Sequence, residues 1–484
     1  MPIVTELDLL KNRRSKIVAT VGPASANRET IAQLIRAGVD VFRINMSHGE
    51  HSAHDAAIAT IREVSAECGT HTAILADLCG PKIRTGKFQN GSVELIADAK
   101  VVVTTRDVIG NSNVIASQYD GLPQDVRSGN RILLNDGAVE LKVERVDGTD
   151  VHCTVIAGGS LGDHKGINLP GVNVSAPSLT DKDRVDAQFA LAQRVDFLAL
   201  SFVRRASDIE SLRAIIDAAS WQPMIVAKIE KPEALENASA IIAATDAIMV
   251  ARGDLGVELN PEQVPVAQDE LIKRAIAANK PVIVATQMLE SMIENARPTR
   301  AEVTDVAHAV GSGTDAVMLS GETAVGAFPV QAVAMMDRIA RQTESYNWHT
   351  LNSQRSEPSG VDQTTIPFGD AVADAVAKLV GDTRARAVLV ISNRGMTAAT
   401  ISAARPKAPV VAISRDEQTC RRMSLMWGVI PHLNQQVGKD NPAVVARGVA
   451  KKLQLAEAGE FVVLVRGFHA ESELNVPTIS LITI

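Results

Sequence analysis

Two oppositely charged side chains stand at the end of an apolar run in the segment IVAKIEKP, residues 225–232. Lys228 and Glu230 are two positions apart, so they share one face of a predicted strand. Other apolar runs also end in polar residues, which could together serve an anionic ligand and a cation. These residues are Arg43, Asn45, Ser47, Asp77, Asp254, Thr286, Ser320 and Glu322, with Lys82 and Arg84 soon after Asp77.

Glu230 and Asp254 are candidate metal ligands. They follow neighbouring apolar runs, so in a parallel sheet their carboxylates would lie close together and repel each other unless a cation separates them. Oxygen ligands, too few for a closed cage and without His or Cys beside them, favour Mg²⁺ or Mn²⁺. Arg43 suits phosphate as a planar fork, and Lys228 suits developing negative charge. Backbone N–H groups of the turn at 252–256 could hold a carboxylate.

Each of these residues also has a plainer interpretation. A single charged residue at a strand end is usually a solvated tip or half of a structural ion pair, and Glu230 could simply pair with the lysine two positions before it. Asn45, Ser47 and Ser320 are individually as typical of turns and caps as of a site. Glu322 would order the surroundings of Ser320 instead of binding metal. Four histidines are interpreted as surface or core residues: His51, His54, His308 and His432.

Eight apolar runs of strand length alternate with helical segments. They begin at Lys16, Val39, Thr72, Val195, Met224, Asp246, Pro281 and Asp315. Most do not alternate apolar with polar residues, which is typical of parallel strands covered on both faces. Eight such units predict an α/β fold, the (β/α)8 TIM barrel, whose chemistry lies at the carboxyl ends of the strands.

A long insertion separates the third run from the fourth. Between Lys87 and Gly171 the sequence changes to short alternating strands broken by Gly, Asn and Asp turns. We therefore expect a small inserted β-barrel lid domain at 87–171. The two barrel segments, 13–86 and 172–350, then come close to the ~250 residues of this fold, after an N-terminal segment at 1–12.

A third domain follows the barrel. The polar, aperiodic stretch 351–362 predicts a linker. Beyond it, the runs AVLVIS, PVVAIS and FVVLVR alternate with helical stretches. Residues 363–484 are therefore expected to form a smaller C-terminal α/β domain, mainly parallel.

Composition excludes several classes of protein. Hydrophobic residues make up 46% and charged residues 22% of the 484, as in a multidomain globular protein. The net charge of -7, without a long basic cluster, argues against nucleic acid as a partner. No leader, membrane span or CxxC pair is visible. These features predict a cytoplasmic protein with reduced thiols and no membrane contact.

Seven segments resemble the signature sequences of pyruvate kinases. They are RINMSHG, GPKIRTG, AKIEKPEA, MVARGDLGVEL, ATQMLESM, RPTRAEVTDVA and DAVMLSGETA, in family order over nearly the whole chain. The resemblance implies the same barrel, lid and C-terminal domain. It also implies phosphoryl transfer from phosphoenolpyruvate to ADP, giving pyruvate and ATP in the last step of glycolysis, by an allosterically regulated homotetramer.

The resemblance assigns roles at the reacting groups. Glu230 and Asp254 would bind the Mg²⁺ (or Mn²⁺), while Arg43 and Lys228 would neutralise charge on the phosphoryl oxygens and the enolate. The substrate carboxylate would be held by the N–H groups of Gly253 and Asp254 and by Thr286, and Ser320 would support a water relay for the proton. The residues implied for the nucleotide are His48, Arg84 and Lys165, with Asp136 approaching the nucleotide's metal ion when the lid closes.

Lys82 departs from the commoner family pattern. Potassium-requiring members have Glu at this position, whereas members with Lys resemble one another in not needing K⁺. An ammonium here could replace the monovalent cation that Asn45, Ser47 and Asp77 would otherwise hold. We therefore predict that K⁺ is not required.

The loop ISNRGMTAA, residues 391–399, resembles the effector-phosphate loop of allosteric members. The candidate ligands of a phosphorylated effector are Ser392, Arg394, Gly395 and Thr397. The later segment at 466–475 lacks the further glycines, Trp and Arg found in members that respond to fructose bisphosphate. Another sugar phosphate or a nucleotide monophosphate is therefore the expected effector.

Two other functions fit parts of the pattern. A magnesium-dependent pyruvate aldolase would share Arg, Glu and Asp at strand ends, but it has no use for an inserted lid or a GPKIRTG segment. A catalytically inactive sugar-phosphate sensor would be expected to have lost at least one catalytic residue. The chain retains all five of them: Arg43, Lys228, Glu230, Asp254 and Thr286.

Overall fold

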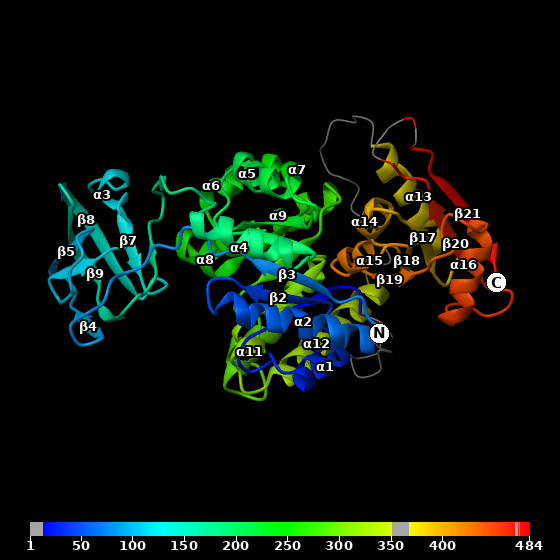
Figure 1. Cartoon of the computed structure of the whole chain (residues 1–484), viewed down its shortest axis with the longest axis horizontal. Helices are drawn as coiled ribbons and strands as arrows, with labels where there is room; N and C mark the ends of the chain where they lie inside the picture. The colour runs from blue at the N-terminus through cyan, green and yellow to red at the C-terminus, as the bar shows by residue number, and fades with distance from the viewer. Residues whose placement is uncertain (1–12, 351–366, 470–472, 474) are drawn as a thin grey trace.

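Three units lie along the length of the molecule (Figure 1), with a β-rich lid at one end, a barrel in the middle and a C-terminal α/β domain at the other end. The computed structural model describes residues 13–350, 367–469, 473 and 475–484. The predicted N-terminal segment at 1–12 and the predicted linker at 351–362 lie outside the described residues.

The barrel is closed by eight parallel strands in the order β1-β16-β15-β14-β13-β12-β3-β2. The strands are β1 (Lys16–Thr20), β2 (Val41–Asn45), β3 (Ala73–Asp77), β12 (Phe197–Leu200), β13 (Met224–Ile229), β14 (Ala247–Ala251), β15 (Val282–Ala285) and β16 (Ala316–Leu319). Each of the eight predicted runs supplies one strand, so the predicted TIM barrel is confirmed.

Both faces of these strands are buried, which explains why the runs do not alternate in polarity. Val18 and Phe197 point into the barrel interior, whereas Ile17 and Leu198 belong to the larger core between strands and helices. The surrounding helices are α1 (Arg28–Ala37), α2 (His51–Glu67), α4 (Asp181–Ala192), α5 (Ala206–Asp217), α6 (Pro232–Glu236), α7 (Ala238–Ala244), α8 (Arg252–Glu258), α9 (Val264–Ala277), α10 (Arg300–Gly311), α11 (Gly321–Ala324) and α12 (Pro329–Thr350). Two 3₁₀ turns, Pro261–Gln263 and Glu290–Ile293, complete the set.

The insertion is an all-β unit, as predicted. Its elements are β4 (Ser92–Leu95), β5 (Lys100–Thr104), β6 (Val114–Ala116), α3 (Leu122–Asp125), β7 (Arg131–Leu134), β8 (Val139–Asp147), β9 (Asp150–Ala157), β10 (Gly159–Gly162) and β11 (Ile167–Asn168). A six-stranded sheet, β11-β7-β8-β9-β5-β6, and the β10-β4 pair share one core. The expected small barrel is thus built from two sheets. The two chain crossings of the neck meet where Arg84 pairs with Gly166.

The C-terminal domain has the expected mainly parallel sheet, in the order β19-β18-β17-β20-β21, with an antiparallel edge strand β21. Its strands are β17 (Val388–Ile391), β18 (Val410–Ser414), β19 (Val429–Leu433), β20 (Phe461–Arg466) and β21 (Thr478–Thr483). Its helices are α13 (Phe368–Thr383), α14 (Met396–Ala403), α15 (Glu417–Met423) and α16 (Pro442–Lys452).

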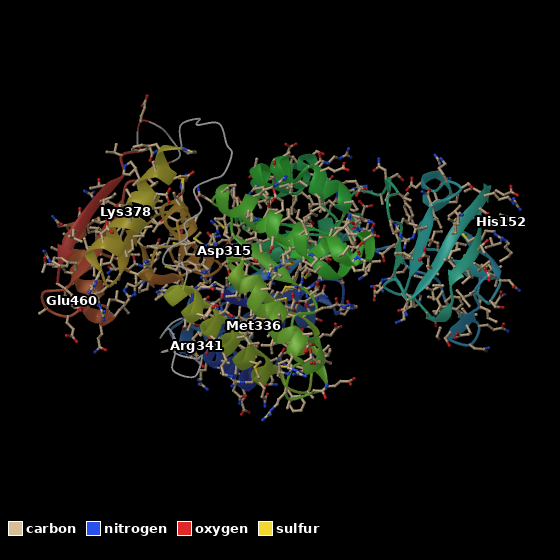
Figure 2. All side chains as sticks on the ribbon, turned by 180° about the vertical axis from the view of Figure 1, so that it is seen from behind. His152, Asp315, Met336, Arg341, Lys378 and Glu460 are labelled. Carbon is tan, nitrogen blue, oxygen red and sulfur yellow. The ribbon has the colours of Figure 1, made fainter. Side chains whose placement is uncertain are left out.

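The C-terminal domain docks on the amino-terminal end of the barrel, which we call the base. Arg421 Nε donates to Asp196 Oδ1 at 2.8 Å, and Arg405 Nη1 donates to Asp315 Oδ1 at 3.0 Å. Figure 2 shows Asp315 at this boundary. The opposite, carboxyl end of the strands is the mouth, and it faces the lid. Among the described residues, no helix is both long and apolar enough to cross a bilayer.

Candidate active site

Four of the predicted residues form one charged network at the barrel mouth. Arg43 Nε donates to Asp77 Oδ2 at 2.7 Å. Lys228 Nζ lies 3.2 Å from Asp77 Oδ1 and 2.9 Å from Glu230 Oε1. The side chains of Asp77 and Glu230 are each 1% exposed. The opposite charges at the end of IVAKIEKP therefore do pair, within a larger buried cluster.

This cluster sets the charge of its members. Burial alone would lower the pKa of Lys228, but the facing carboxylates of Asp77 and Glu230 outweigh burial and raise it. Burial alone would raise the pKa of Asp77, but Lys228 and Arg43 hold it below its usual value. Lys228 is therefore a cation, and Asp77 an anion, throughout the physiological pH range.

Glu230 differs from Asp77 in that its charge is only partly compensated. Burial, followed by the nearby charge of Asp254, raises the pKa of Glu230 despite the opposing effect of Lys228. The backbone N–H of Phe202 donates to Glu230 Oε2 at 2.7 Å, and Glu230 Oε1 faces the ammonium of Lys228, which Asp77 shares.

The donor set fits a divalent cation held by few protein ligands. Two interacting carboxylates, those of Glu230 and Asp254, are suited to Mg²⁺ or Mn²⁺, whose remaining positions take water or substrate oxygens. Within the described part of the chain, no group of three or more His, Cys, Asp or Glu residues forms a closed metal cage.

Gly253 and Thr286 meet at the adjoining strand ends. The Gly253 N–H donates to Thr286 Oγ1 at 2.6 Å, and Asp254 lies in the first turn of α8. Thr286 has a φ of 71°, and its carbonyl accepts from Arg252 Nη2 at 2.8 Å. Arg252 thereby secures an otherwise unfavourable backbone conformation at the residue predicted to face the substrate.

Ser320 begins the turn after β16. Glu322 Oε2 accepts from the Ser320 N–H at 2.7 Å, and its Oε1 accepts from the Leu289 N–H at 3.0 Å. Glu322 is 3% exposed, and burial raises its pKa. Its carboxylate therefore bridges two strand ends and is positioned to orient the turn that carries Ser320.

An open pocket lies between the lid neck and the mouth. Among the predicted residues, Lys82, Asp136 and Asp254 line it. Its lining also includes the apolar residues Leu169, Val172, Val174 and Phe202. The pocket therefore joins the predicted lid residue Asp136 to the barrel end of the site.

The other residues predicted for the nucleotide lie beside the neck. Arg84 Nη1 donates to the carbonyl of His164, next to Lys165, at 3.0 Å. Burial lowers the pKa of His48, and the positive charges of Arg84, Lys82 and Arg43 lower it further. These cations form a positive wall close to the mouth.

The residues predicted for the monovalent-cation site are only partly brought together. Asp77 is held by Arg43 and Lys228, whereas Asn45 Oδ1 accepts from the Ser47 N–H at 3.2 Å in a turn after β2. Lys82 is exposed and lines the pocket.

The predicted effector residues lie in the turn before α14 and in its first turn, where Thr397 is the second residue of the helix. Ser392 Oγ accepts from the Gly395 N–H at 3.1 Å, and Gly395 has a φ of 89°, which favours glycine. Ser392 and Thr397 are buried, while Arg394 is exposed.

Two residues that contact the charged network were missed from the sequence. Lys228 Nζ donates to Ser201 Oγ at 2.7 Å, and Arg43 Nη1 donates to Thr20 Oγ1 at 3.1 Å. Thr20 ends β1, and Ser201 directly follows β12. A search for polar residues at the ends of these two strands, as made for the other strands, would have found both residues.

Comparisons with known proteins agree with this geometry. The barrel-domain model of pyruvate kinase matches residues 12–333, and the alpha/beta-domain model of pyruvate kinase matches residues 370–480. Pyruvate kinase 2 of Synechocystis is 44% identical over 460 residues, covering 94% of this chain and 76% of that protein. Pyruvate kinase of Geobacillus stearothermophilus is 44% identical over 463 residues, covering 94% and 78%.

A solved structure extends the likeness to three dimensions. The crystal structure of a pyruvate kinase from Cryptosporidium parvum superposes with a TM-score of 0.89 at 36% identity, covering 99% of this chain and 98% of the other. Both domain models, the sequence relatives and the superposition agree over nearly the whole length. The chain therefore belongs to the pyruvate kinase family.

Proposed function

We propose that the chain carries out the reaction of its family, transfer of a phosphoryl group from phosphoenolpyruvate to ADP, with the charged network at the mouth as its centre. The observation that carries the proposal is the buried cluster of Arg43, Asp77, Lys228 and Glu230, which gathers two cations and two carboxylates at the strand ends, next to the charge of Asp254. So many buried charges at the mouth of a barrel are more typical of a site for a charged ligand than of a structural ion pair.

The residues of the site would have separate roles in the reaction. Arg43 and Lys228 neutralise the transferring phosphoryl group and the enolate that remains, and burial strengthens both effects. Thr286 and the start of α8 orient the substrate carboxylate, and Ser320 supports a water that delivers a proton to the enolate carbon. Asp136 and the lid exclude bulk water during transfer.

Pyruvate kinases generally use Mg²⁺, and Glu230 and Asp254 would hold it (or Mn²⁺) here. When bound, the ion screens the two carboxylates from each other and polarises substrate oxygens. The reaction is tested by measuring pyruvate production from phosphoenolpyruvate and ADP with and without Mg²⁺. We expect production that depends on Mg²⁺, and a purified protein that makes no pyruvate in either condition would contradict the assignment.

We also propose that turnover does not need K⁺, because the ammonium of Lys82 takes the role of a monovalent cation near the phosphoryl site. Activity with tetramethylammonium as the sole monovalent cation should match activity with K⁺. Lys82→Glu should create a K⁺ requirement, and Lys87→Glu, the same charge change at an exposed lysine nearby, should not. A collapse of wild-type activity without K⁺ would reject the proposal.

Regulation, assembly and location complete the proposal. The turn at Ser392–Thr397 would bind a phosphorylated effector, and calorimetry with sugar phosphates and nucleotide monophosphates tests it.

The chain would assemble as a homotetramer in the cytoplasm, where glycolysis supplies phosphoenolpyruvate. Sedimentation would measure the assembly, and a monomer at micromolar concentration would contradict it.

A further inference from the structure

A buried ion pair lies directly behind the two candidate metal ligands. Lys231 follows Glu230 in the chain, and Glu258 comes four residues after Asp254 on α8, one turn along the same helix. Lys231 Nζ donates to Glu258 Oε1 at 2.5 Å. The side chains are 11% and 1% exposed, respectively. The pair therefore links the end of β13 to α8, the two elements that carry Glu230 and Asp254.

The surroundings of Glu258 point to a role beyond stability. Its second oxygen, Oε2, is buried and has no hydrogen-bond partner, while Asn168 Nδ2 of the lid neck lies 3.4 Å from Oε1. Lys231 lines the pocket at the mouth together with Asp254. A buried ion pair seldom adds net stability compared with apolar residues, and an unsatisfied carboxylate oxygen lowers stability further.

The geometry explains what such a pair could do. Glu230 and Asp254 follow the adjacent strands β13 and β14, so their like charges repel each other when no cation lies between them. Carboxylates in that situation separate unless their backbones are held. The Lys231–Glu258 pair joins the same two backbones and opposes this separation.

We propose that Lys231 and Glu258 are a positioning pair that holds Glu230 and Asp254 at the spacing required by a divalent cation. The proposal rests on the proposed function, because it takes those two carboxylates as the metal ligands. Neither Lys231 nor Glu258 is itself a ligand in this scheme.

The test measures the dissociation constant of Mn²⁺ alone for the full-length protein by electron paramagnetic resonance. Lys231→Met and Glu258→Gln should each weaken Mn²⁺ binding by about 10-fold or more, as expected when a partner that orients a metal ligand is lost. The double variant should bind about as weakly as the weaker single variant, because both changes break one link. Lys231→Arg should restore most of the affinity.

Through-space electrostatics alone makes a different prediction. Removing the Lys231 cation would tighten Mn²⁺ binding, removing the Glu258 anion would weaken it, and the double variant would return to the wild-type value. That pattern, or unchanged affinity in both single variants, would overturn the proposal. Circular dichroism checks folding, and Lys231→Gln, for which the two schemes also predict opposite changes in Mn²⁺ affinity, replaces Lys231→Met if that variant does not fold.

A matched pair on the barrel surface serves as the control. Arg274 Nε lies 2.8 Å from Glu270 Oε1 on α9, and both side chains are exposed. Arg274→Met and Glu270→Gln should leave Mn²⁺ affinity unchanged. If the wild-type protein bound no Mn²⁺, the positioning pair and the metal-ligand assignment would both be rejected, whereas the phosphoryl-transfer reaction is judged separately by pyruvate production.

Discussion

The two ends of the barrel use carboxylates in opposite ways. At the base, an aspartate precedes each of four strands and accepts the backbone N–H of a residue at the start of a neighbouring strand. The four bonds are Ile17 to Asp40, Ile74 to Asp196, Ile225 to Asp246 and Val282 to Asp315, between 2.8 and 3.0 Å. Each aspartate also pairs with at least one arginine. None of the four has a buried side-chain oxygen without a partner in the described residues.

The mouth leaves its carboxylates incomplete. Asp77 Oδ1 and Glu230 Oε1 share the single ammonium of Lys228, at 3.2 and 2.9 Å, and Glu258 Oε2 is buried without a hydrogen bond. Because buried carboxylate oxygens with a shared cation or no partner lower stability, their retention at the mouth is consistent with a ligand that completes the site there. The contrast distinguishes a structural ion pair from one that serves a ligand.

Exchanging one lysine at each end provides the strongest test. Lys228→Met should lower kcat by about 10²–10³-fold, because it removes a buried cation from the developing negative charge. Lys16, which donates to the carbonyl of Val429 at 2.7 Å, is the matched buried lysine at the base. Lys16→Met should lower the thermal midpoint and leave kcat nearly unchanged. Similar losses of kcat in both variants would remove the distinction between the two ends.

Asp196→Asn should destabilise the contacts at the base and leave the active site at the mouth unchanged. Asp196 is fully buried and is paired with Arg62 and Arg421, so neutralising it removes the anion that these two arginines share and leaves Arg421 only its more exposed partner Glu417. We expect the free energy of unfolding to fall by about 3 kcal/mol. Denaturant unfolding measures this, with Asp147→Asn at an exposed pair as the control. An unchanged midpoint would show that the aspartates at the base are dispensable.

His48 should report the arrival of a nucleotide at the mouth. Burial and the neighbouring Arg84, Lys82 and Arg43 lower its pKa, so the fold favours neutral imidazole. Its contribution to stability is therefore present above about pH 6.5, its ordinary pKa, and lost as the pH falls through the lowered value. Bound ADP would reverse the surrounding charge and raise the pKa of His48. NMR titration of the histidines, with the His48 signal assigned from the His48→Gln variant, measures this pKa with and without ADP. An unchanged pKa of His48 with ADP would contradict nucleotide binding beside these cations.

The smallest expected effect is a difference in thiol reactivity between buried and partly exposed cysteines. Burial raises the pKa of Cys153 and Cys420 to about 12, so their reactive thiolates are scarce at pH 8. Cys68 and Cys79 are partly exposed, and Cys79 lies two residues after Asp77 at the mouth. A thiol reagent at pH 8 should label these two and spare the others until the protein unfolds. Rapid labelling of Cys420 would show that α15 opens readily at the base.

The sequence predicted the fold well because strand periodicity is a local signal. Each barrel strand is mostly apolar, with its charged residues at or near the ends, and burial on both faces leaves little ambiguity. The mouth was largely predictable for the same reason, since the closed barrel brings residues at strand ends such as Arg43 and Lys228 together. The two-sheet form of the lid was not predictable, because alternating strands do not reveal which of their edges pair.

The contacts that could not be predicted are formed between residues far apart in the sequence. Asp196 and Asp315 look like ordinary turn residues before apolar runs, and only the docked C-terminal domain reveals their arginine partners. Lys231 and Glu258 lie 27 positions apart, and nothing in their local sequence indicates that they meet. Whether Lys82 replaces K⁺ and which effector binds near Ser392 are not tested by the fold, and both stay predictions.

The pairing of β3 with β12 across the lid bears on how the chain folds. Leu75 lies opposite Phe197 in the barrel, so closing it joins segments separated by the whole insertion. A disordered loop of that length makes this step entropically costly and slow. The meeting of Arg84 with Gly166 at the neck shortens the effective loop once the lid has its own core. We therefore expect the lid to form early, so that the domain predicted to close over a substrate also brings together the parts of the chain that must complete the barrel.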